Sequence, residues 1–231
     1  MKSIVYPYVY HFENRLWIMR DGVGEKPRRT TRKSEVVAWD LQPSEVIDGI
    51  KDQNLGRHFI SHFQTLDVDP IGIKEAYKSH GYRNLLSEGF FVHDSSRLPD
   101  FSTPPIVKRV CTLEESKLIS RERRNRKAIR DVDLDAESPD HRLYAIFEGK
   151  KALGWVGSVP IGKASWIADL YVLPEYRGRG FGSALMSEVT REDRRNGVKT
   201  SVLLASAAGA RLYPHLGYRQ IGTLQLFCPK H

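Results

Sequence analysis

The sequence has few cysteines and no long apolar run, and each shortage excludes a class of protein. Cys111 and Cys228 are the only cysteines among 231 residues, which leaves no disulfide framework and no cysteine zinc site, so we expect both to be reduced thiols. The longest apolar runs, such as residues 201–205, fall far short of the roughly 20 residues of a membrane helix. Residues 1–7 carry no apolar signal segment. We therefore expect a cytoplasmic protein without a membrane partner.

Basic charge is in excess, but aromatic residues do not accompany it. The chain has 36 Lys and Arg against 28 Asp and Glu, a formal net charge of +8. Its densest basic cluster, residues 121–130, has no aromatic side chain on which a base could stack, and no zinc-finger spacing or RNA-binding signature occurs. A solvated helix face is the favoured interpretation of the cluster. Attraction of an acidic ligand or substrate is the second, and nucleic-acid binding is the third.

Residues 93–105 are rich in Pro, Ser and Asp, which is typical of a linker. We predict an N-terminal α+β unit over residues 1–95, a linker over 96–104 and a C-terminal domain over 105–231. The pattern of the C-terminal domain indicates an α/β fold with a mixed sheet. Its expected elements are a strand at 106–110, a helix capped by Thr112 and Glu115, a hairpin at 143–147 and 152–159, a strand ending at Leu173, a helix at 181–195, a strand at 199–205, a short helix at 207–215 and a strand at 220–227.

The most informative segment runs from Asp169 to Met186 and predicts a strand, a glycine-rich turn and the start of a helix. Gly178, Gly180 and Gly182 lie in the turn, where the lack of a Cβ lets backbone N–H groups approach a ligand. The N-terminus of the following helix carries roughly half a unit of positive charge. The segment therefore predicts an anion site, although its spacing matches neither a dinucleotide-binding loop nor an NTPase loop.

The run Arg177-x-x-Gly180-x-Gly182 resembles the pyrophosphate loop of the GNAT N-acetyltransferase superfamily, which binds acetyl-CoA. The preceding residues 170–174 resemble that family's fourth strand, and residues 205–219 resemble its next strand, helix and turn. The resemblance implies a GNAT-like acyl-CoA N-acyltransferase fold for the C-terminal domain, with acetyl-CoA as co-substrate and no metal. It also implies a set of cofactor-binding residues. These are Leu170, Tyr171, Val172, Arg177, Gly178, Arg179, Gly180, Phe181, Gly182 and Ser183.

The resemblance implies transfer of an acetyl group to a primary amine by direct attack in a ternary complex. A bulge in the fourth strand of such proteins frees backbone groups that polarise the acetyl carbonyl, which maps here to residues 170–172. Tyr213 matches the position whose phenol often reprotonates the thiolate that leaves. The alternative for Tyr213 is a packing role beneath the last helix, and the alternative for the loop arginines is that they are solvated charges.

The general base is the weak point of this assignment. Some relatives carry a glutamate where this sequence has Ala168, so Asp169 is the nearest carboxylate, although it could instead serve the structure. His215 is a second candidate, with a surface role as its alternative. His58 and His62 stand four residues apart without a third ligand, so we expect no metal there.

Two features suggest an internal repeat. Residues 77–83 and 213–219 share the pattern Tyr-x-x-x-Gly-Tyr-Arg, and residues 36–43 are similar to 169–174. The corresponding loop, residues 44–50, has one glycine and two acidic residues where a phosphate would need donors. We predict a degenerate GNAT-like unit in residues 1–95, with an unrelated α+β extension as the alternative and a common strand order as the test.

The partner we expect is a small-molecule amine. Three alternatives stay open: a protein N-acetyltransferase, a non-catalytic acyl-CoA-binding or regulatory protein, which the missing glutamate favours, and a nucleic-acid-binding module, which the net charge favours. The aromatic segment Tyr6–Tyr10 is compatible with a homodimer interface or with a buried strand.

Overall fold

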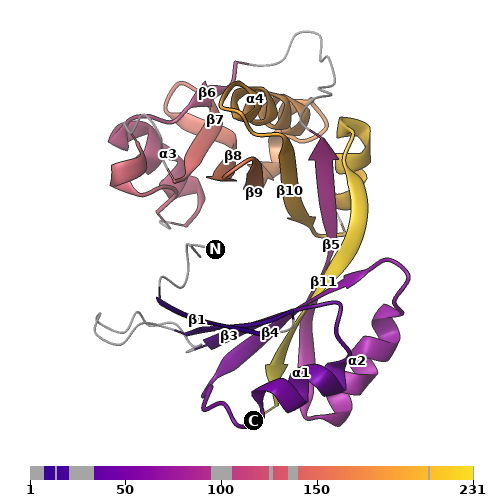
Figure 1. Ribbon diagram of the computed structural model, residues 1–231. Coiled ribbons are helices and arrows are strands. Elements are labelled where there is room, and N and C mark those ends of the chain that lie inside the picture. The colour runs from indigo at the N-terminus through magenta and orange to yellow at the C-terminus, as the bar shows by residue number, and fades with distance from the viewer. Residues whose placement is uncertain are drawn as a thin grey trace. The chain divides into compact units, whose positions relative to one another are not determined.

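The computed structural model describes residues 8–13, 15–20, 34–94, 106–124, 127–134, 140–207 and 209–230 (Figure 1). Its contacts divide the chain into two compact units. Unit 1 comprises Met1–Phe90 and Ile221–His231, and unit 2 comprises Phe91–Gln220. The predicted linker at 96–104 lies outside the described residues, as do residues 6 and 7 and the side chains of residues 8–10. The last strand, which we assigned to the C-terminal domain, belongs to unit 1 from Ile221 onward.

Unit 2 is built on a sheet with the strand order β10-β9-β8-β7-β6, and it contains the glycine-rich turn. Neighbouring strands from β6 to β9 are antiparallel, whereas β9 and β10 are parallel. Its elements are β6 (Lys108–Arg109), α3 (Leu113–Glu122), η1 (Asp131–Asp133), β7 (Arg142–Glu148), β8 (Lys151–Ile161), β9 (Ala164–Val172), η2 (Pro174–Tyr176), α4 (Phe181–Arg195), β10 (Thr200–Ala205), η3 (Gly209–Arg211) and η4 (Tyr213–Leu216).

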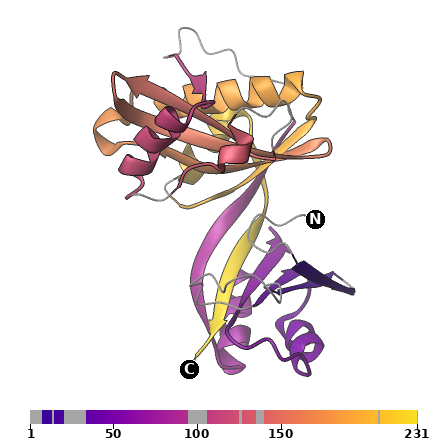
Figure 2. The same cartoon turned by 90° about the vertical axis from the view of Figure 1, so that its left-hand side faces the viewer.

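Helices α3 and α4 cover opposite faces of this sheet, as Figure 2 shows. Alternation along β7 explains why: Tyr144 and Ile146 pack in one core with Leu185 of α4, while Leu143 and Ala145 pack in another core with α3. The predicted cap of α3 is confirmed, since the Thr112 hydroxyl accepts from the Glu115 N–H and the Glu115 carboxylate accepts from the Thr112 N–H. The predicted helix at 207–215 is replaced by the two 3-10 turns η3 and η4.

Unit 1 has the strand order β1-β2-β3-β4-β11-β5 and its own core. Residues of β2, β3, β4 and β11 pack against both helices, with Val46 and Tyr77 at the centre. Among the described residues, every helix of either unit is too short or too polar to cross a bilayer. The elements of unit 1 are β1 (Tyr8–Glu13), β2 (Leu16–Arg20), β3 (Ser34–Trp39), α1 (Pro43–Ile50), β4 (His58–Thr65), α2 (Pro70–Ser79), β5 (Tyr82–Asp94) and β11 (Arg219–Pro229).

The two halves of the chain share one order of elements. In each half, three antiparallel strands are followed by a helix and by a strand parallel to the third: β1-β2-β3, α1 and β4 in the first, and β7-β8-β9, α4 and β10 in the second. The last strands of the two halves, β5 and β11, lie side by side in unit 1, where β11 also pairs with β4. The boundary between the units therefore falls inside these two strands.

Candidate active site

A β-bulge interrupts β9 just before the glycine-rich turn. Trp155 of β8 pairs with Tyr171, but Gly157 pairs with Ala168, so two residues of β9 oppose one residue of β8. One of the two is Asp169, whose φ of 55° lies in the left-handed region. The extra residue reverses the alternation of β9: Tyr171 stacks on Trp155, on the face that α3 covers, whereas Leu170 packs into the core with α4.

The turn after β9 carries a series of backbone N–H groups at the start of α4. Gly178 and Gly180 have φ angles of 75° and 78°, and a Cβ at either would meet nothing, so it is the backbone conformation that calls for glycine. Helix α4 begins at Phe181, and its first helical bond runs from the Ala184 N–H to the Gly180 carbonyl. Among the described residues, none accepts a hydrogen bond from the N–H groups of residues 178–183. Unbonded N–H groups at the N-terminus of a helix favour an anion, and we call residues 178–183 the cradle.

Two exposed arginines flank this cradle. Arg177 donates from Nε to the Val172 carbonyl at 3.0 Å, and its guanidinium lies 5.4 Å from the centre of the Tyr171 ring. The Arg179 guanidinium lies 5.3 Å from the centre of the Tyr176 ring. Aromatic rings thus hold both cations close to the turn. The predicted cofactor-binding residues from Leu170 to Ser183 therefore lie at the end of β9, in the turn and at the start of α4.

Comparison with known proteins relates this arrangement to a protein family. Residues 139–220 match the family model described as "Acetyltransferase (GNAT) domain". That segment is a GNAT acetyltransferase domain. It includes the bulge, the turn and α4, so the chain contains an acyltransferase domain, and the resemblance noted in the sequence is confirmed. Curated proteins give no significant match.

Solved structures extend the likeness in fold over most of the chain. A GCN5-related N-acetyltransferase from Kribbella flavida has a TM-score of 0.64 and 13% identity, covering 96% of this chain and 90% of its own. A GCN5-related N-acetyltransferase from Sphaerobacter thermophilus has a TM-score of 0.61 and 16% identity, covering 93% and 76%. A tandem GNAT protein from the clavulanic acid biosynthesis pathway has a TM-score of 0.54 and 13% identity, covering 92% and 77%. The predicted GNAT-like fold is confirmed.

Within the GNAT domain, Tyr213 is buried in the core beside α4. Its ring centre lies 5.8 Å from that of Phe91 and 5.6 Å from that of Tyr218. The Tyr218 phenol pairs with the Ser201 hydroxyl at 2.7 Å, and burial raises the pKa of Tyr218 to about 12. Tyr213 therefore has a packing role, which is compatible with the catalytic role predicted for it.

The predicted bases differ in their surroundings. Asp169 is half-exposed and forms an ion pair with Arg123 at 2.9 Å, while His215 is exposed on η4. The imidazole of His58 is hydrogen-bonded to the phenol of Tyr82, and that of His62 to the phenol of Tyr77. Over the described ranges, no three His, Cys, Asp or Glu side chains gather as metal ligands do.

One titratable side chain beside the bulge escaped sequence reasoning. His141 lies just before β7, and a Cβ on Gly157 would be 2.6 Å from its Nε2 atom. Burial lowers the pKa of His141 below its ordinary value. It is 27 positions from Ala168 and belongs to no motif, and the only signal was Gly157, since glycine inside a strand often marks the close approach of another group.

Proposed function

We propose that this protein transfers an acetyl group from acetyl-CoA to a primary amine of a small molecule, by direct attack in a ternary complex. One observation carries the proposal: the N–H groups of residues 178–183 have no acceptor among the described residues and follow a bulged strand in a GNAT domain. The cradle fits a pyrophosphate, because anions bind where N–H groups converge at a helix N-terminus. Backbone groups of Leu170, Tyr171 and Val172 would bind the pantetheine and polarise the acetyl carbonyl.

Calorimetric titration with acetyl-CoA tests the cradle. The variant Arg179→Gln removes a charge that would contact the pyrophosphate, so we expect affinity to fall about tenfold. Arg194→Gln, in the last turn of the same helix, is the matched control and should bind as the wild type does. Equal acetyl-CoA affinity of the wild type and both variants would show that the pyrophosphate does not bind at this turn.

The N-terminus of α1 in unit 1 is unsuited to a phosphate, which supports one cofactor site per chain. Its Gln42 N–H donates to the Glu45 carboxylate at 2.6 Å, so an acidic side chain already occupies the place where a phosphate would bind. With the shared order of elements, this supports our prediction that residues 1–95 are a degenerate GNAT-like unit and that the catalytic domain lies within residues 105–231. We expect one acetyl-CoA per chain, and a calorimetric stoichiometry of two would contradict it.

Tyr213 would donate a proton to the thiolate of CoA as the C–S bond breaks. The variant Tyr213→Phe keeps the ring between Phe91 and Tyr218 and removes only the hydroxyl. We expect turnover to fall about 10²-fold, because general acid catalysis contributes at least that much, with acetyl-CoA affinity unchanged. Unchanged turnover would limit Tyr213 to packing.

A non-catalytic acyl-CoA-binding protein is the second candidate, because Ala168 replaces the family's glutamate and Asp169 is engaged by Arg123. The two candidates differ in thiol release. A panel of small amines and amine-bearing peptides should yield CoA thiol only if the protein is an enzyme, and the peptides report a protein acceptor. Binding of acetyl-CoA without thiol release from any of them would favour the second candidate.

A further inference from the structure

The imidazole of His141 lies close to Gly157, the strand partner of Ala168, and Ala168 stands where some relatives carry a glutamate. Gly157 pairs with Ala168 across the sheet, and opposite residues of antiparallel strands direct their side chains to the same face. A Cβ on Gly157 would lie 2.6 Å from His141 Nε2 and 3.5 Å from the Ala168 carbonyl oxygen. Gly157 and Ala168 contribute almost no side chain, which leaves room for the ring of His141 against the α3 face at Gly157.

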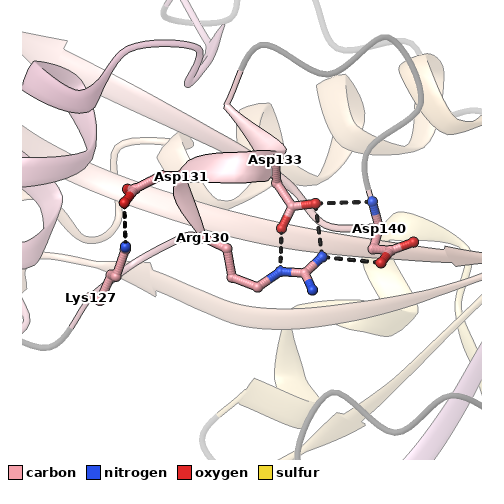
Figure 3. Close-up of polar contacts among 5 residues, drawn as sticks. All are labelled: Lys127, Arg130, Asp131, Asp133 and Asp140. Carbon is pink, nitrogen blue, oxygen red and sulfur yellow. Dashed lines mark hydrogen bonds and ion pairs between the residues drawn. The ribbon is translucent and has the colours of Figure 1, made fainter. Parts of the chain in front are cut away.

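Ion pairs fix the backbone on both sides of His141. Figure 3 shows the first: Arg130 donates two hydrogen bonds to the Asp133 carboxylate, at 2.6 and 2.9 Å, and a third to Asp140 at 3.1 Å. The Asp140 N–H also donates to Asp133 at 3.1 Å, directly before His141. On the other side, Arg142 forms a buried ion pair with Asp193 at 3.1 Å.

Four charged groups act on the imidazole, and its burial outweighs them. Desolvation lowers the pKa of His141, the carboxylates of Asp133 and Asp169 oppose the shift, and the guanidinium groups of Arg130 and Arg123 reinforce it. The ring is therefore neutral at pH 7. A neutral imidazole has a nitrogen lone pair and can accept a proton.

We propose that His141 is the general base of the acetyl transfer, in the place of the absent glutamate. The inference rests on the proposed function. The ammonium of the acceptor gives a proton to the imidazole, directly or through a water, and becomes a neutral amine. The amine nitrogen then attacks the acetyl carbonyl carbon beside residues 170–172, a C–N bond forms and the C–S bond breaks. The acylated nitrogen loses its extra proton to solvent, and the thiolate takes up a proton from Tyr213, which solvent reprotonates. His141, now an imidazolium, returns its proton to solvent.

The activity test compares four variants. His141→Gln fills the same space without a titrating group, His141→Ala removes the ring, Asp169→Asn tests the candidate from the sequence, and exposed His80→Gln, at the end of α2, is the control. We expect His141→Gln to bind acetyl-CoA within twofold of the wild type and to lower kcat about 10²-fold or more. The kcat of the wild type should level off once His141 is deprotonated, whereas the kcat of His141→Gln should continue to rise with pH. Added imidazole should restore activity to His141→Ala. Intact binding with an unchanged kcat and pH profile would overturn the proposal.

A second measurement needs no turnover. The ring signal of His141, assigned by its absence from the His141→Gln spectrum, is followed by NMR in the free and the acetyl-CoA-loaded wild-type protein. We expect a pKa below the ordinary value of a histidine and a change in the signal when acetyl-CoA binds. If binding of acetyl-CoA leaves the signal unchanged, the role of His141 is overturned but the proposed function is not. Failure of the wild type to bind acetyl-CoA overturns the proposed function itself, and with it this inference.

Discussion

Acidification should destabilise unit 1 through His62. The side chain lies fully buried in β4, with Nδ1 2.8 Å from the Tyr77 phenol oxygen and the two rings edge to face. Burial lowers the pKa of His62 from 6.5 to about 4, and the nearby Asp40 carboxylate offsets only part of this shift. The folded chain therefore keeps His62 neutral at a pH where the unfolded chain would protonate it.

The sign and size of the effect follow from linkage. The unfolded chain binds the proton below a pH near 6.5 and the folded chain only near 4, so stability is lost as the pH falls through this interval. Between about pH 7.5 and pH 5, the free energy of unfolding should fall by about 2 kcal/mol from His62 alone. Other groups also titrate over this range, so a matched variant is needed to isolate this contribution.

Urea unfolding at the two pH values provides the measurement. The variant His62→Gln keeps a polar side chain beside Tyr77 but cannot titrate, so its loss of stability on acidification should be about 2 kcal/mol smaller than that of the wild type. His80→Gln, exposed at the end of α2, is the control and should match the wild type. If His62→Gln loses as much stability as the wild type does, the reasoning from burial is refuted.

Three further predictions concern packing, and urea unfolding measures each. Replacing Arg142 by Leu leaves the Asp193 carboxylate buried without its cation and should cost about 3–5 kcal/mol, so a neutral result would contradict the ion pair. Leu185→Ala opens a cavity beneath α4 and should cost about 2–5 kcal/mol. At Gly222 a Cβ would lie 2.3 Å from the Gln64 carbonyl oxygen, so Gly222→Ala should cost about 1–3 kcal/mol, and wild-type stability would exclude this close approach.

Local signals accounted for much of the GNAT domain. The predicted helix at 181–195 coincides with α4, because its apolar spacing and the glycines before it are features that a short stretch of chain carries by itself. The left-handed turns at Gly178 and Gly180 follow from the same sequence pattern. The short helix at 207–215 was less well predicted, since Pro214 and the apolar residues around it suit a tight 3-10 turn equally well.

The family resemblance placed a bulge at residues 170–172, but the regular alternation of a strand, applied to β9, failed to predict which face each side chain takes. A regular strand would place Ala168 and Leu170 on one face, but the extra residue sends Leu170 into the core with α4 and leaves Ala168 beside Gly157. A bulge depends on the pairing with β8, and Asp169 is a rare non-glycine residue in the left-handed region. No pattern within β9 itself marks it.

The sequence by itself determined the strand, glycine turn and helix that form the anion cradle, because backbone conformation there depends on residues close together in the chain. Only the tertiary structure decided which strands neighbour β5 and β11, and which side chain lies beside Ala168. Both depend on contacts between segments far apart in the sequence. Such contacts form where whole faces can be buried together, and no short motif records their partners.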